Sequence, residues 1–171
     1  MIEKIRDIKR ILFGAFGYEF TSHPKTIAPV LLSVRGIIQN EKGEYLVVKR
    51  SRSDKRDGSK WEFPGGKVER GEFDPIQTLI HEIHEETNLE IEISTASPYC
   101  IIREAIEQKN SPYTHFALVT LYYKCKPTTN DLKISFEHEG YAWKKLNEIN
   151  GALEISKFTE EIMKSGFLDT F

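Results

Sequence analysis

The chain has 171 residues, enough to bury a core without covalent cross-links. Apolar residues make up 39% and charged residues 29%, a balance that excludes a collagen-like, disordered or coiled-coil chain. The formal net charge of −2 gives no overall attraction to nucleic acid, so a basic binding site would have to be local.

The cysteine content and the lack of long apolar runs indicate a cellular setting. Cys100 and Cys125 are the only two cysteines and do not form a C-x-x-C pair, which favours a reducing compartment. The first residues carry charge throughout, and no run approaches 18 apolar residues. We therefore expect a cytoplasmic protein without a membrane span.

Residues 2–13 place isoleucines at helical spacing with basic residues between them. This pattern predicts an amphipathic helix that packs on the domain or in a dimer. A basic helix on a membrane surface is the alternative, although the stripe is short and lacks Trp. Glycines and a proline then interrupt the pattern. We expect residues 1–26 to be this helix and a linker, and residues 27–171 to be the main domain.

The main domain begins with two predicted strands. The segment Val30–Gln39 is rich in β-branched and apolar residues, and Tyr45–Lys49 repeats that character. The run Asn40–Gly43 between them is typical of a turn. A polar loop over Ser51–Lys60 follows, and we expect it to lie at the surface.

A helix follows, and both of its ends can be predicted. Asp74 is a suitable N-cap, and Pro75 fits the first helical position. Apolar spacing continues to Thr87, and Asn88 suits a left-handed stop. Later strands are predicted at 91–93, 98–103, 115–125 and 141–144, and a closing helix at 154–164. Strands and helices interleave without a regular βαβ repeat, which predicts one mixed α/β domain.

The predicted helix carries three acids on one face. Glu82, Glu85 and Glu86 fall within roughly 100° of arc, beside an isoleucine-rich face. Three close carboxylates repel one another unless solvent or a cation neutralises them. A solvated helix face is one interpretation. A site for a hard divalent cation is the other, and the Gly65–Gly66 pair upstream favours it, because paired glycines let the backbone approach a ligand.

The segment from Gly66 to Leu89 resembles the Nudix box, G-x5-E-x7-R-E-U-x-E-E-x-G-U, in which U is bulky and apolar. The first two anchors are Gly66 and Glu72, and the approach from Trp61 to Gly65 is similar to that of MutT-like members. The later anchors are Glu82, Ile83, Glu85, Glu86 and Leu89. The resemblance implies a Nudix-type α/β/α sandwich with a mixed β-sheet.

Three departures from the box are visible. Eight residues, not seven, separate Glu72 from His81, and we place the extra residue in the loop. His81 stands where the family has Arg, and Asn88 stands where it has Gly. None of these changes removes a metal-binding carboxylate.

The resemblance also implies roles for individual residues. Glu82 and Glu86 are the main metal ligands, with Glu85 acting directly or through water. The Gly65 carbonyl joins them, and Glu137 is a candidate general base or extra ligand, unless it is a solvated loop acid. Glu82 and Glu85 are counted with Glu137 as catalytic candidates.

Supporting and substrate-binding roles follow in the same way. Gly66 and Glu72 shape the loop–helix junction, and His81 takes the place of the arginine that braces Glu72. Arg50 aligns with a phosphate-contacting arginine, and Phe63 is a candidate to stack on a base. A surface arginine and a core aromatic are the alternatives for these two.

The implied activity is Mg²⁺-dependent hydrolysis of a nucleoside diphosphate-linked compound, with Mn²⁺ as an alternative ion. MutT-like relatives favour cleavage of a nucleoside triphosphate to nucleoside monophosphate and pyrophosphate. The alternatives are an ADP-ribose, sugar-nucleotide or dinucleotide pyrophosphatase, and a catalytically silent nucleotide-sensing module. The expected partner is a small-molecule nucleotide rather than a membrane or a nucleic acid polymer, and a homodimer stays open.

Overall fold

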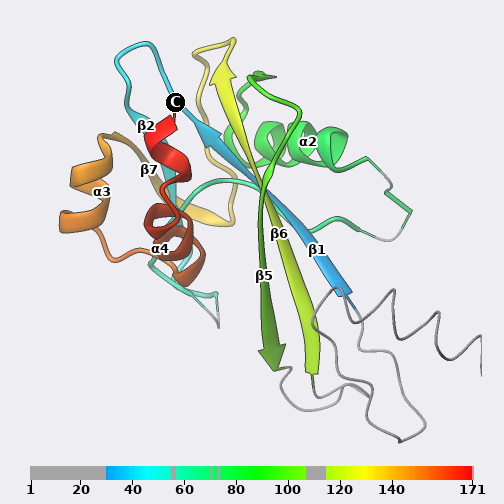
Figure 1. Ribbon diagram of the computed structural model, residues 1–171. Helices are drawn as coiled ribbons and strands as arrows, with labels where there is room; N and C mark the ends of the chain where they lie inside the picture. Colours follow the sequence, from blue (N-terminus) through cyan, green and yellow to red (C-terminus); the bar gives the residue numbers. More distant parts are fainter. Residues whose placement is uncertain (1–29, 55–56, 70, 73, 107–114, 171) are drawn as a thin grey trace, which may run out of the picture.

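The computed structural model describes residues 30–54, 57–69, 71–72, 74–106 and 115–170 (Figure 1). The predicted N-terminal helix and linker, residues 1–26, lie outside the described residues, so the domain boundary stays a prediction. Within the described ranges, no helix has both the length and the apolar character needed to cross a membrane.

The larger of two sheets is built around β6 (His115–Pro127). Strand β1 (Val30–Ile38) runs parallel to β6 along one edge. Strands β5 (Tyr99–Ile106) and β4 (Ile91–Ile93) pair antiparallel with its other edge, one after the other. The sheet is therefore mixed, as expected from the irregular interleaving of strands and helices.

The smaller sheet has the order β3-β2-β7 and is antiparallel. It consists of β3 (Trp61–Glu62), β2 (Tyr45–Arg50) and β7 (His138–Lys144). The register between β2 and β7 shifts after Lys49, so that Arg50 lies opposite His138. An irregularity of this kind re-aims side chains near the end of a strand.

Helices cover both faces of this arrangement. Figure 1 shows α2 (Pro75–Thr87) on one side, and α3 (Leu146–Ala152), α4 (Lys157–Lys164) and the 3₁₀ helix η1 (Phe167–Thr170) on the other. The α/β/α sandwich with a mixed sheet is confirmed.

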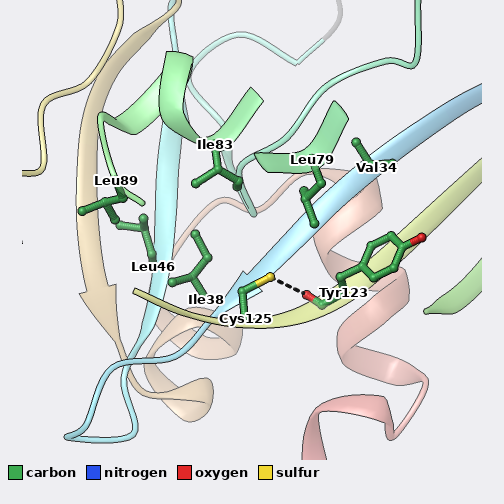
Figure 2. Close-up of a cluster of buried hydrophobic side chains, with 8 residues drawn as sticks. All are labelled: Val34, Ile38, Leu46, Leu79, Ile83, Leu89, Tyr123 and Cys125. Carbon is green, nitrogen blue, oxygen red and sulfur yellow. Dashed lines mark hydrogen bonds between the residues drawn. The ribbon is translucent and has the colours of Figure 1, made fainter. Parts of the chain in front are cut away.

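Strand β1 divides the core into two clusters because successive side chains of a strand point to opposite faces. Val34 and Ile38 pack with Leu79 and Ile83 of α2 (Figure 2). The intervening Ile37 belongs to a second cluster on the side of α3 and α4. All of these side chains are fully buried, and each buried aliphatic side chain contributes about 1.5 to 3 kcal/mol to folding.

The predicted ends of α2 are confirmed. The Asp74 carboxylate accepts hydrogen bonds from the N–H groups of Ile76 and Gln77 at 2.9 and 3.4 Å, and Pro75 opens the helix. Asn88 has a φ of 58° and donates its N–H to the carbonyl of His84 at 2.8 Å. These caps fix the phase of the helix and therefore the direction in which its acids point.

The C-terminal region differs from expectation. The closing helix was expected from residue 154, but α4 begins at Lys157 with Ser156 as its N-cap. The preceding residues instead pair with Trp61, whose N–H donates to the Glu154 carbonyl at 2.9 Å. Helices α3 and η1 were not predicted, because elements of seven and four residues carry little periodic signal.

Candidate active site

The three acids of α2 line a pocket of about 160 Å³ together with Glu137. Helix α2 supplies Glu82, Glu85 and Glu86, and the loop before β7 supplies Glu137. Its lining also includes Glu69, Ser135 and Phe136. The structure thus brings together four of the predicted site residues, which are up to 55 positions apart in the sequence. We call this the acidic pocket.

The Gly65–Gly66 turn approaches both the sheet and the helix too closely for any side chain. Gly65 has a φ of +134°, and a Cβ there would lie 2.3 Å from the Val34 carbonyl oxygen. A Cβ on Gly66 would lie 2.1 Å from the carboxyl carbon of Glu82. The Glu82 carboxylate therefore rests against bare backbone, which gives the predicted Gly66 anchor its physical reason.

Glu86 is the most buried acid of the pocket. Its Oε2 accepts the Gly65 N–H at 2.8 Å, and the side chain is almost fully enclosed. Burial raises the pKa of Glu86 to about 8, although Arg35 and the Gly65 N–H act in the opposite direction. Burial and the neighbouring Glu85 also raise the pKa of Glu82. Arg35 and the Gly65 N–H thus compensate the negative charge of this pocket only in part.

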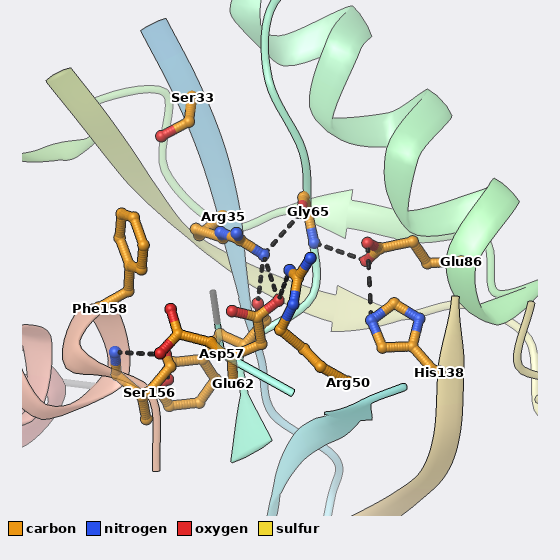
Figure 3. A network of polar contacts seen from close by, with 12 residues as sticks. Ser33, Arg35, Arg50, Asp57, Glu62, Gly65, Glu86, His138, Ser156 and Phe158 are labelled. Carbon is orange, nitrogen blue, oxygen red and sulfur yellow. Dashed lines mark hydrogen bonds and ion pairs between the residues drawn. The ribbon is translucent and has the colours of Figure 1, made fainter. Parts of the chain in front are cut away.

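Arg35 is a buried charge that was not among the predicted site residues. Its Nη1 donates to the carbonyls of Gly65 and Phe63 at 2.6 and 3.1 Å, and to Oε1 of Glu62 at 3.2 Å (Figure 3). The resemblance implies that the Gly65 carbonyl joins the metal ligands. In the structure this oxygen accepts the arginine while the Gly65 N–H holds Glu86, and a metal-binding role of the carbonyl stays a prediction. The sequence did contain a signal for Arg35, because it is a charged residue inside an otherwise apolar strand.

Arg50 shares the same buried carboxylate. Its Nη1 lies 2.6 Å from Oε1 of Glu62, and its Nη2 lies 2.5 Å from Oδ2 of Asp54. Glu62 therefore joins two arginines from β1 and β2, and its side chain is only 2% exposed. Arg50 is half-buried and ion-paired rather than a free surface arginine.

His138 is a second residue that the sequence did not indicate. Its imidazole is buried, with Nε2 3.8 Å from Oε1 of Glu86, and the shift in the β2–β7 register places it there. Burial lowers the pKa of His138 to about 4, so the ring is neutral at pH 7. The contact with Glu86 is then not a charged pair at neutral pH.

The predicted brace of Glu72 by His81 is not found. Oε2 of Glu72 accepts the N–H of Glu69 at 2.9 Å and the hydroxyl of Thr78 at 3.2 Å. His81 is exposed and, within the part of the chain that the structure describes, makes no hydrogen bond to Glu72. Glu72 does tie the loop to the first turn of α2, as its predicted position at the junction implied.

The prediction of a stacking surface at Phe63 was wrong. Phe63 is 1% exposed and packs in the second core cluster with Tyr122 and Ile162. Because this core encloses the ring, a base cannot stack on it. The aromatic residue that lines the acidic pocket is Phe136, which is 92% exposed.

A second pocket of about 350 Å³ adjoins the acidic pocket, and we call it the polar pocket. Phe136 and Glu137 line both pockets, and Arg50 lies in the polar pocket. Its remaining lining residues are Ser51, Ser53, Asp54 and Lys67. Arg50 and Lys67 thus place basic side chains beside the acidic pocket, so one ligand can contact side chains of both charges.

The donor chemistry of the acidic pocket fits a divalent cation. Among the described residues, no three His, Cys, Asp or Glu side chains form a ready-made cage for an ion. Mg²⁺ does not need such a cage, since it usually keeps several waters and takes one or two carboxylates plus substrate phosphates. The only partly compensated carboxylates of Glu82 and Glu86 are hard oxygen donors of this kind.

Comparisons with known proteins agree with this geometry. A family model described as NUDIX domain matches residues 30–165. A "MutT-like protein" of Streptomyces ambofaciens is 28% identical over 119 residues, which are 70% of this chain and 66% of that protein. An 8-oxo-dGTP diphosphatase of Escherichia coli (strain K12) is 43% identical over 54 residues, which are 32% of this chain and 40% of that protein.

These matches cover less than two thirds of the length of either relative. A solved structure matches over more of its length. The crystal structure of MutT protein from Methanosarcina mazei Go1 has a TM-score of 0.66 and 25% identity, and the match covers 85% of this chain and 96% of that one.

Proposed function

The chain belongs to the Nudix family, and from this premise we propose that it hydrolyses a nucleoside triphosphate to a nucleoside monophosphate and pyrophosphate with the help of a divalent cation. Nudix hydrolases generally use divalent metal ions, and Mg²⁺ is the ion proposed here, with Mn²⁺ as the alternative. The E. coli relative named as an 8-oxo-dGTP diphosphatase supports a triphosphate substrate.

The acidic pocket is the observation that carries this proposal. Glu82, Glu85 and Glu86 meet Glu137 in one pocket, and burial together with mutual repulsion raises the pKa of Glu82 and Glu86. Such a pocket repels a bare polyphosphate but accepts one that arrives with cations. A solvated helix face does not explain why Glu86 is buried.

The residues divide the chemistry between them. A bound cation supplies neutralisation of the phosphate oxygens and activation of a water. Glu82 and Glu86 would hold it. Glu137 or Glu85 would take the proton of the attacking water as its oxygen bonds to phosphorus, the bridging P–O bond breaks and pyrophosphate leaves. Gly65 and Arg35 keep Glu86 in place during this step.

The test is a substrate panel for the wild-type chain and Glu86→Gln at alkaline pH with Mg²⁺. Ordinary and oxidised nucleoside triphosphates are scored by phosphate release after added pyrophosphatase. We expect turnover of one or a few triphosphates, and a loss on the order of a hundredfold or more in Glu86→Gln. Glu90→Gln is the matched control, because Glu90 is an exposed acid just beyond the end of the same helix.

A second arm of the panel tests the alternatives. It contains ADP-ribose, sugar nucleotides and dinucleotides, coupled to a phosphatase. Turnover of this set alone would keep the acidic pocket as the active site and refute the triphosphate substrate. Nucleotide binding without any turnover would favour a sensing module.

A further inference from the structure

The burial of Phe63 removes the aromatic surface that the sequence offered for a base. Among the described residues, the exposed large hydrophobic side chains include only two aromatic ones, Phe136 and Tyr141. Phe136 is 92% exposed and Tyr141 is 47% exposed. Of these two, only Phe136 lines a pocket.

Phe136 lies in the wall that the acidic and polar pockets share. A ligand whose phosphates enter the acidic pocket with cations can therefore extend past this ring into the polar pocket. A pocket of about 350 Å³ lies within the size range of small-molecule sites. The space is sufficient for a nucleoside attached to those phosphates.

The lining of the polar pocket suits the remaining parts of a nucleotide. Ser51 and Ser53 offer hydroxyl groups, which lie 2.9 Å from each other. Asp54 offers a carboxylate held in place by Arg50. Lys67 is exposed and can meet the phosphate nearest the sugar. Hydroxyl and carboxylate groups bind ribose hydroxyls and base edges, whereas a flat aromatic ring binds the face of a base.

We propose that the polar pocket is the nucleoside subsite and that Phe136 stacks on the base. This inference rests on the proposed function and adds where the base binds. The ring would act by binding rather than by chemistry, since it offers no group that moves a proton. Stacking on Phe136 would therefore strengthen the binding of nucleotides but not of phosphate chains without a base.

The experiment compares Phe136→Ala with Phe136→Tyr in kinetics and in calorimetric titration with Mg²⁺. For the nucleoside triphosphate that the wild type prefers, we expect the alanine variant to raise KM and Kd about tenfold and to leave kcat within about twofold. The tyrosine variant should restore wild-type values. The Kd of inorganic tripolyphosphate, which has no base, should be the same for all three proteins.

Tyr141→Ala is the matched control, because this exposed aromatic residue lines neither pocket. A second variant tests the pocket without touching the ring. Ser53→Trp adds a large side chain at another lining residue of the polar pocket and should weaken binding of the nucleotide but not of tripolyphosphate. Since Ser53 is exposed, this substitution leaves the core intact.

The outcomes separate the two proposals. Unchanged nucleotide affinity in Phe136→Ala, or equal weakening of tripolyphosphate, overturns the nucleoside subsite while the hydrolase proposal stands. If the wild type turns over no triphosphate but Phe136→Ala still weakens nucleotide binding alone, the hydrolase proposal fails and the subsite stands. A wild-type chain that binds no nucleoside triphosphate overturns the subsite.

Discussion

The backbone N–H of Gly65 donates a 2.8 Å hydrogen bond to the buried carboxylate of Glu86. The same residue accepts Arg35 through its carbonyl at 2.6 Å. The turn is therefore fixed from both sides, by a strand arginine and by a helix acid. Because Gly66 follows directly and lies against Glu82, one short segment positions both proposed metal ligands.

Replacement of Arg35 by Met should destabilise the fold more than replacement by Lys. The methionine leaves the Gly65 carbonyl without this donor and leaves Glu62 with Arg50 as its partner, and breaking a buried charge pair costs about 3 to 5 kcal/mol. Lysine keeps the charge and, like Nη1 here, offers its donors from a single nitrogen, although an ammonium group is more strongly hydrated than a guanidinium. Urea unfolding measures both variants. Equal stability of Arg35→Lys and Arg35→Met would show that the charge at this position does not matter.

Gly66→Ala should reduce activity through displacement of Glu82. The added methyl group would lie 2.1 Å from the Glu82 carboxyl carbon, so the acid has to move by more than an ångström. Displacement of this size at a reacting centre costs on the order of a hundredfold in rate. Steady-state hydrolysis measures it. Gly151→Ala is the matched control, since a methyl group there meets nothing within 4 Å. Equal activity of the two variants would contradict the close approach.

The sequence was sufficient for features that depend on local chemistry. Asp74 and Asn88 mark the two ends of α2 as predicted. A capping side chain and a left-handed residue each act on the helix end where they lie, so their effect is local. These two caps set the phase of α2, and the three acids expected on one face of it line one pocket. Gly66 was recognisable from spacing, although its reason, the contact with Glu82, needed the structure.

The rest could not be predicted because it depends on contacts between distant segments. Phe63 is buried in a core cluster that includes Ile162 of α4, whereas Phe136 stays exposed, and the sequence pattern around each gives no sign of this difference. His138 enters the site through a shift in strand register. Arg35 was visible as a charge within an apolar strand, but its partners come from a turn that folds over that strand.

Protein free of divalent cations should lose stability as the pH rises from 4.5 to about 8. Burial raises the pKa of Glu86 from 4.5 to about 8, so the folded state favours the protonated acid. The stability that protonated Glu86 contributes is complete below pH 4.5 and is lost as the pH rises through 8. The loss is at most about 1.4 kcal/mol for each unit of pKa shift.

Chemical unfolding across this pH range measures the effect of Glu86. The Glu86→Gln variant should show a flatter profile, because it has no proton to lose. Addition of Mg²⁺ should stabilise the wild type more at pH 9 than at pH 6, since the cation binds the ionised acid. Parallel profiles for the two proteins would refute the assignment to Glu86.

His138 should act in the opposite direction and at lower pH. Burial lowers the pKa of His138 from 6.5 to about 4, so the folded state favours the neutral ring. The stability that this preference contributes is complete above pH 6.5 and is lost as the pH falls toward 4. His138→Asn removes the titration, and the quantity to compare is the slope between pH 6.5 and 4 rather than absolute stability. His84→Asn is the control for the loss of an imidazole, because that histidine is exposed. A wild-type slope in His138→Asn would mean that the acid loss arises from other groups.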